Sequence, residues 1–65
     1  MEAKEFKRKR IRLGLTQTEL AEILDVKPNT VSRYETGTLT ISKVVELALD
    51  AVERKMKEEN LLIET

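Results

Sequence analysis

Two short segments with clear helix start and stop signals lie near the middle of the chain, and they constrain its fold more than any other feature. Thr16 and Glu19 have the spacing of a capping box, in which each side chain accepts a hydrogen bond from the backbone N–H of the other residue. Pro28 suits the first turn of a helix, and Gly37 suits a left-handed helix end. We therefore predict one helix from Thr16 to near Asp25 and a second from Pro28 to Gly37.

Two further helices are predicted, one on either side of this pair. The N-terminal helix, over residues 2–13, is indicated by larger side chains that recur on one face at helical spacing, namely Phe6, Arg10 and Leu13. The fourth helix begins within residues 40–42 and runs to about Glu58, and no strand is expected before residue 60. The chain is thus predicted to be all-α, with a small four-helix domain over residues 1–58 and a C-terminal tail over residues 59–65.

Composition narrows the classes of function. The 65 residues include no cysteine and no histidine, which removes disulfides and Cys/His zinc sites. The sequence has no Gly-rich phosphate loop and no constellation of catalytic side chains, so we expect neither an enzymatic activity nor a bound cofactor or metal. No apolar run has the length of a membrane span, and the N-terminal segment lacks the apolar stretch of a signal peptide, so we expect a cytoplasmic protein.

The charges sum to zero but form blocks along the sequence. Residues 1–15 carry six bases and two acids, a net +4, and residues 16–26 carry three acids and no base, a net −3. Residues 27–43 carry three bases and one acid, a net +2, and residues 44–65 carry three bases and six acids, a net −3. These blocks predict a folded chain with one positive and one negative face, so a net charge of zero does not exclude a nucleic-acid partner.

The two central helices are separated only by the sequence DVK, which is the spacing of a helix-turn-helix, with the small residue Ala21 where the helices approach. The whole stretch LGLTQTELAEILDVKPNTVSRYETG closely resembles the DNA-binding domain of the lambda repressor-like family, which includes phage repressors, Cro proteins and small bacterial regulators. The matching elements are LTQxELA, Leu24, Val26, TVSRYE and Gly37. The resemblance is strong over residues 6–37 and loose over residues 40–52.

This resemblance implies double-stranded DNA as the partner and a role for the polar residues around the turn. In the family, the second helix of the pair enters the major groove, and the first helix crosses the DNA backbone. The candidate base readers are Asn29, Ser32 and Arg33, because Asn can pair with adenine, and Arg with guanine, through two hydrogen bonds each. The candidate phosphate contacts are Gln17, Lys27, Thr36 and Lys43, with the backbone near Thr36 and Gly37 as a further anchor.

Two departures from the family pattern concern the start of the reading helix. Many relatives have Ser or Thr at position 27, whereas Lys27 cannot accept the capping hydrogen bond, so we expect a looser or earlier start. Pro28 stands where relatives often have a polar base reader, so readout at that edge is expected to be apolar. The resemblance also implies a buried ion pair between Arg10 and Glu35, which both lie on the inner faces of their predicted helices.

The fourth predicted helix leaves two alternatives open. Its apolar side chains span an arc of about 200°, wider than one core requires: Ile41, Val44, Val45, Leu47, Ala48, Leu49, Ala51, Val52 and Met56. Either this helix is deeply packed in a small bundle, or part of its face meets a second subunit together with Leu61, Leu62 and Ile63. A homodimer presents two reading helices about 34 Å apart, which suits a palindromic operator.

The leading functional prediction is therefore a DNA-binding transcriptional regulator, most simply a repressor or Cro-like protein that acts by occupying its operator. The alternative is an antitoxin-type interaction protein whose main partner is another protein. The broad apolar face of the fourth helix and the NLLIE sequence near the C-terminal end are the support for that alternative.

Overall fold

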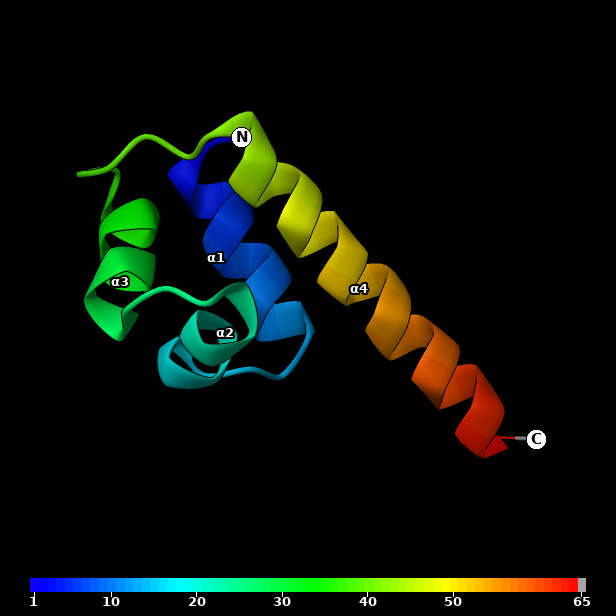
Figure 1. The fold of residues 1–65 in the computed structure, drawn as a ribbon. Helices are drawn as coiled ribbons and strands as arrows, with labels where there is room; N and C mark the ends of the chain where they lie inside the picture. The colour runs from blue at the N-terminus through cyan, green and yellow to red at the C-terminus, as the bar shows by residue number, and fades with distance from the viewer. Residues whose placement is uncertain (65) are drawn as a thin grey trace.

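A computed structural model describes the backbone of residues 1–64 and the side-chain surroundings of residues 1–59. Over the described residues it contains four helices and no strand: α1 (Ala3–Arg12), α2 (Gln17–Leu24), α3 (Pro28–Thr36) and α4 (Lys43–Glu64). Figure 1 shows α1, α2 and α3 gathered into one body, with α4 running beside α1 and projecting beyond it. The predicted all-α, four-helix class is confirmed.

The start of α2 has the predicted capping box. The Thr16 hydroxyl accepts a hydrogen bond from the N–H of Glu19 at 3.1 Å, and the Glu19 carboxylate accepts one from the N–H of Thr16 at 2.9 Å. At its other end, Asp25 takes a left-handed conformation with φ of 57°, and the N–H of Val26 donates to Ala21 O at 2.9 Å. Asp is one of the few non-glycine residues that tolerate this conformation, so the turn toward α3 closes without a glycine.

The reading helix α3 begins at Pro28 and ends before Gly37. Lys27 is its N-cap and makes no side-chain capping bond. The earlier helix start that was one of the two expected consequences is not observed, because the helix begins at Pro28. Gly37 has φ of 80°, and its N–H donates back to Tyr34 O at 3.4 Å. The helix is therefore bounded by a proline and a left-handed glycine, as the sequence indicates.

The extent of α4 differs from the prediction. The helix begins at Lys43, where the Ser42 hydroxyl accepts a hydrogen bond from the N–H of Val45 at 3.3 Å. It runs to Glu64, so the predicted end of this helix near Glu58 is wrong. The physical reason is that residues 59–64 contain no glycine or proline to stop a helix. The side chains expected to meet a second subunit, at residues 61–63, lie outside the described ones.

One hydrophobic core joins all four helices. Its buried members are Phe6, Leu20, Ala21, Val31, Tyr34, Ile41 and Leu49. The rings of Phe6 and Tyr34 are tilted against each other with centroids 5.4 Å apart, a favourable aromatic geometry that ties α1 to α3. Ala21 is fully buried where α2 packs on α3, which agrees with the need for a small residue at that contact.

Among the described side chains of α4, those on one edge reach this core. Leu49 is fully buried and Val45 packs against the core, but Val44 is 75% exposed and Leu47 is 56% exposed. Ion pairs complete the attachment of α4: Lys9 Nζ lies 2.8 Å from Asp50 and 3.8 Å from Glu53, and the amino terminus lies 3.3 Å from Glu46. The first alternative, a helix deeply packed over its whole apolar arc, is therefore not what the structure shows, because Val44 and Leu47 are exposed.

Candidate nucleic-acid interface

The outward face of α3 carries the three predicted base readers. Val31 and Tyr34 are buried against the core, which turns the opposite side of this helix to the surface. Asn29 and Arg33 are exposed and four residues apart, so their side chains lie one above the other on that side. Ser32 is half-buried and lies between the exposed and the buried faces.

The predicted phosphate contacts lie at the two ends of α3 and on the neighbouring helices. Lys27 is exposed at its N-cap and Thr36 is exposed in its last turn, while Lys43 is exposed at the first residue of α4. The structure therefore places exposed groups at both ends of α3, although Lys43 belongs to a different helix. Gln17, the fourth candidate, is half-buried at the first residue of α2.

The backbone after α3 differs from what the sequence suggested. The N–H groups of Thr38 and Leu39 both donate to the carbonyl oxygen of Arg33, at 3.0 and 3.2 Å. These amides are thus occupied within the chain, as is the N–H of Gly37. Two threonine hydroxyls lie beside these amides. Thr36 Oγ1 donates a hydrogen bond to Arg33 O at 3.3 Å and lies 2.9 Å from Thr38 Oγ1. The hydroxyls of Thr36 and Thr38 are exposed, but each would have to give up a hydrogen bond within the chain to donate one to an anion.

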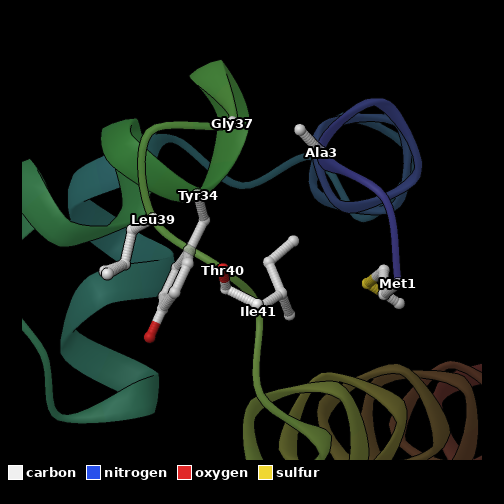
Figure 2. Close-up of a pocket in the computed structure, with 7 residues that line it drawn as sticks. All are labelled: Met1, Ala3, Tyr34, Gly37, Leu39, Thr40 and Ile41. Atoms are coloured by element: carbon white, nitrogen blue, oxygen red, sulfur yellow. The ribbon is translucent and has the colours of Figure 1, made fainter.

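The loop between α3 and α4 lies over the start of α1. A small pocket of ≈ 180 Å³ separates these segments. Figure 2 shows the residues that line it, namely Met1, Ala3, Tyr34, Gly37, Leu39, Thr40 and Ile41. Ile41 is buried in the core, so it fixes the loop between the reading helix and Lys43. The sequence pattern placed Ile41 in the apolar arc of the fourth helix, whereas the structure has it in the loop before α4.

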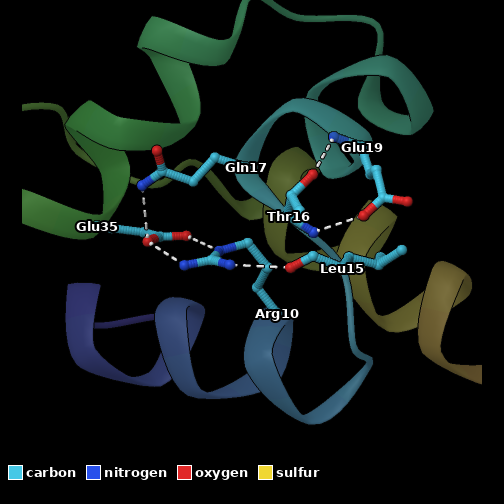
Figure 3. A network of polar contacts seen from close by, with 6 residues as sticks. All are labelled: Arg10, Leu15, Thr16, Gln17, Glu19 and Glu35. Carbon is cyan, nitrogen blue, oxygen red and sulfur yellow. Dashed lines mark hydrogen bonds and ion pairs between the residues drawn. The ribbon is translucent and has the colours of Figure 1, made fainter.

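A network of polar contacts lies behind the outward face and joins three helices (Figure 3). Arg10 of α1 donates to the Glu35 carboxylate through Nε at 2.6 Å and through Nη2 at 3.0 Å, and through Nη1 to Leu15 O at 2.9 Å. Gln17 of α2 donates from Nε2 to the same carboxylate at 3.1 Å. The side chain of Glu35 is 3% exposed and that of Arg10 is 13% exposed, so this ion pair is largely excluded from water.

The surroundings of Glu35 and Arg10 favour the ionised form of both side chains. Burial acts to raise the pKa of Glu35, but hydrogen bonds from Arg10 and Gln17 and the charges of Arg10 and Lys7 outweigh it, so the pKa lies below its ordinary value. The hydrogen bond with Glu35 likewise raises the pKa of Arg10. Both groups are therefore ionised at neutral pH, and one carboxylate restrains side chains from two other helices.

The match to known families coincides with this architecture. The model of the helix-turn-helix family matches residues 6–49, which is 44 of the 65 residues. The chain belongs to the lambda repressor-like helix-turn-helix family. The matched segment begins at the buried Phe6 and ends at the buried Leu49, so it spans the whole hydrophobic core. No curated protein and no solved structure gives a significant match to the chain.

Membership of the lambda repressor-like family makes the chain a DNA-binding transcription regulator of this type. The part of the chain that the structure describes has no group of three or more side chains placed to bind a metal ion. Within the same residues, no helix is both long enough and apolar enough to cross a membrane.

The contact between Gln17 and Glu35 is among those that sequence reasoning missed in this lambda repressor-like domain. Gln17 was expected to meet a phosphate, but the hydrogen bond from its amide to Glu35 was not foreseen. The two residues are 18 positions apart, so no local spacing rule connects them. A Gln at a helix start and a Glu in the last turn of the next helix were the only signals in the sequence.

Proposed function

We propose that this lambda repressor-like protein is a sequence-specific repressor that occupies operator DNA with α3 in the major groove. The observation that carries the proposal is the division of α3 into two faces. Val31 and Tyr34 fix the helix to the core, and Asn29 and Arg33 are exposed together on the other side. A helix so attached can enter the major groove, which is wide enough to admit it, without reorganising the domain.

The side chains of α3 would divide the readout between them. The guanidinium of Arg33 suits the two acceptors of guanine, and the carboxamide of Asn29 suits the donor and acceptor of adenine. Ser32 is half-buried, so it contributes at most a single hydrogen bond from the edge of the face. Pro28 at the first helical position offers an apolar surface, which suits a thymine methyl group.

Phosphate contacts would then fix the register of α3 along the duplex. Lys27 and Lys43 suit this role as exposed point charges, and Thr36 as an exposed hydroxyl. Gln17 lies at the N-terminal end of α2, where the helix dipole favours an anion. Gln17 Nε2 donates one of its two N–H groups to Glu35, so Glu35 can orient the carboxamide while the second N–H donates to a phosphate oxygen.

Repression follows from occupancy, since a protein bound to an operator blocks the polymerase. Two copies with two-fold symmetry would place their α3 helices about 34 Å apart, one helical turn of DNA, and would select an inverted repeat. The location of the protein would be that of the DNA, in the cytoplasm. Since the family is a regulatory one, we propose no catalytic activity.

Selection from a randomised duplex pool at two salt concentrations tests this function. We expect an enriched inverted repeat. Arg33→Ala should relax the preference at one position of each half-site, whereas Gln17→Ala should weaken binding to all sequences alike. Thr18→Ala, at an exposed neighbouring position of α2, is the matched control and should leave both properties unchanged. Weak, salt-sensitive binding without enrichment would contradict the proposal.

A second candidate function is that of an antitoxin-type protein whose main partner is another protein. It is favoured by the exposed apolar side chains Val44 and Leu47 on α4, which the core leaves uncovered. Isolation of the protein from its own cells, followed by identification of stoichiometric partners, separates the two functions. A tight partner lost in Leu47→Asp, together with no sequence preference on DNA, would favour this second candidate.

A further inference from the structure

One side of α1 is not covered by the other described helices. The covered side is marked by three residues: Arg10 donates to Glu35 of α3, Phe6 is fully buried in the core, and Lys9 bonds to Asp50 of α4. At 3.6 residues per turn, these three side chains occupy an arc of about 100°. Figure 1 shows α1 lying between α3 and α4. The opposite side of α1 is therefore turned to solvent.

Three bases lie in a row along this outer side. Lys4, Arg8 and Arg12 are all exposed, and they follow one another at intervals of four residues, so their side chains lie one above the other. Among the described residues, none of the three forms an ion pair. Like charges at this spacing repel one another on a helix. The row therefore lowers the stability of α1 unless an anionic partner lies against it.

A surface hollow of ≈ 320 Å³ lies along the same row, lined by Glu5, Arg8, Lys9 and Arg12. Lys9 is already bound to α4, and its pKa is raised chiefly by its hydrogen bond with Asp50, with the charge of Glu5 acting in the same direction. The two guanidinium groups of the hollow are left without such a partner. A guanidinium matches a carboxylate through two parallel hydrogen bonds, so the hollow suits carboxylates.

An apolar side chain among these bases decides between anionic partners. Ile11 is 58% exposed and lies three residues after Arg8 and seven after Lys4, on the same side of the helix. A nucleic-acid backbone would pair with the bases but would leave Ile11 without an apolar contact. A membrane surface needs a broad apolar face, whereas Phe6 and Leu13 of this segment pack into the core. A protein segment with both carboxylates and an apolar side chain satisfies the whole surface.

We propose that the outer side of α1, formed by Lys4, Arg8, Ile11 and Arg12, binds an acidic helix of another protein. Carboxylates of that helix pair with the two arginines, and one of its apolar side chains covers Ile11. This partner goes beyond the proposed function, because its surface lies apart from the base readers on α3. It also lies apart from the exposed apolar residues of α4, so a chain bound to DNA keeps the surface available.

A synthetic helical peptide with adjacent rows of Glu and Leu along one face is the probe, titrated against the full-length chain. Fluorescence anisotropy of the labelled peptide measures affinity, and backbone amide NMR shifts locate the contact. Arg8→Glu and Arg12→Glu should each weaken binding about tenfold or more. Lys55→Glu makes the same charge reversal at an exposed position of α4 and is the matched control, which should bind as the wild type does.

The apolar part of the contact is tested from both sides. Ile11→Ser should weaken binding severalfold, with circular dichroism showing that the helices persist. A second peptide with Gln in place of Leu should bind the unchanged chain with a similar loss, so this result does not depend on how any variant folds. Amide shifts should be largest for residues 4–12 in the titration with the first peptide.

Several results would overturn the proposal. They are an absence of binding at millimolar peptide, amide shifts confined to α3, a loss in Lys55→Glu equal to that in Arg8→Glu, and equal binding of the Leu and Gln peptides. A random-sequence duplex or a phosphatidylglycerol vesicle, tested as competing probes, would also overturn it by shifting residues 4–12 where the peptide does not. The duplex result would assign this side of α1 to nucleic acid, and the vesicle result would assign it to a membrane.

Discussion

Gln17 and Glu35 are joined by a hydrogen bond of 3.1 Å between the first turn of α2 and the last turn of α3. The same carboxylate accepts two hydrogen bonds from Arg10 of α1. One acidic side chain thus connects the three helices of the DNA-binding body. Because α3 carries the proposed base readers and Gln17 is a proposed phosphate contact, Glu35 fixes the position of one relative to the other.

Removing the basic partner of this carboxylate should destabilise the domain. Arg10→Met keeps much of the side-chain volume but leaves Glu35 as a charge that is 3% exposed and has lost its ion pair. We expect the free energy of unfolding to fall by roughly 3–5 kcal/mol, as measured by urea denaturation. Arg12→Met, at an exposed position of α1, is the control and should change it by less than about 0.5 kcal/mol. A loss below about 1 kcal/mol in Arg10→Met would mean that the pair is open to solvent.

The same pair should make stability fall in acid. The pKa of Glu35 is lowered by folding, so the stability that its charge contributes is fully present above its ordinary pKa of 4.5. This contribution is lost as the pH falls through the lowered value. The hydrogen bonds of Glu19 with Thr16, and that of Asp50 with Lys9, also lower the pKa values of those acids, so they add to the loss in the same direction.

The variant Glu35→Gln isolates the part that belongs to Glu35. It should be less stable than the wild type at neutral pH, because Arg10 loses its charged partner. The difference should shrink as the pH is lowered from about 6 to about 3, since protonation makes the wild-type side chain neutral as well. Thermal unfolding across that range measures it, with Glu58→Gln as an exposed control. A difference that stays constant with pH would show that the charge of Glu35 does not contribute.

Local sequence signals predicted the ends of the helices around the turn. The capping box at Thr16 and Glu19 and the boundaries at Pro28 and Gly37 are short-range patterns, and all of them are present. Helical spacing also indicates which face of α3 is turned outward, because Val31 and Tyr34 fall on one side of the helix and both are buried. These features depend on residues only a few positions apart.

Other features depended on contacts that no local pattern reveals. The wide apolar arc of α4 did not show that Val44 and Leu47 remain exposed, because that depends on how little of the small body faces the helix. The sequence predicts an end of α4 near Glu58, whereas the helix continues to Glu64 because the segment NLLIE contains no helix breaker. The bond between Gln17 and Glu35 joins positions 18 residues apart and appears only after the helices are packed.

The end of the reading helix should be sensitive to its backbone conformation rather than to crowding. A Cβ atom at Gly37 would have no heavy atom within 4 Å, but its φ of +80° is strained for other residues. Gly37→Ala should therefore lower the free energy of unfolding by about 1–2 kcal/mol. Gly37→Asn should cost less, because Asn tolerates the left-handed region. Chemical denaturation of the two variants tests this order, and equal losses would point to a lost contact instead of strain.

The start of α3 should show a conflict between stability and DNA binding. Lys27 is the N-cap in an extended conformation and makes no capping bond, so Lys27→Ser supplies the missing acceptor for a free N–H of the first turn. We expect the free energy of unfolding to rise by about 0.5–1 kcal/mol. The same change removes a proposed phosphate contact, so affinity for DNA should fall for all sequences alike.

Salt dependence separates these two effects of Lys27→Ser. The slope of log K against log salt concentration should decrease in magnitude by about 1, because one fewer counterion is released on binding. Lys57→Ser, on α4 and paired there with Glu53, removes the same charge away from α3 and should leave the slope unchanged. A variant that gains stability with an unaltered slope would show that Lys27 caps poorly but does not contact phosphate. If stability fell instead, Lys27 would have to stabilise α3 through a contact other than a cap.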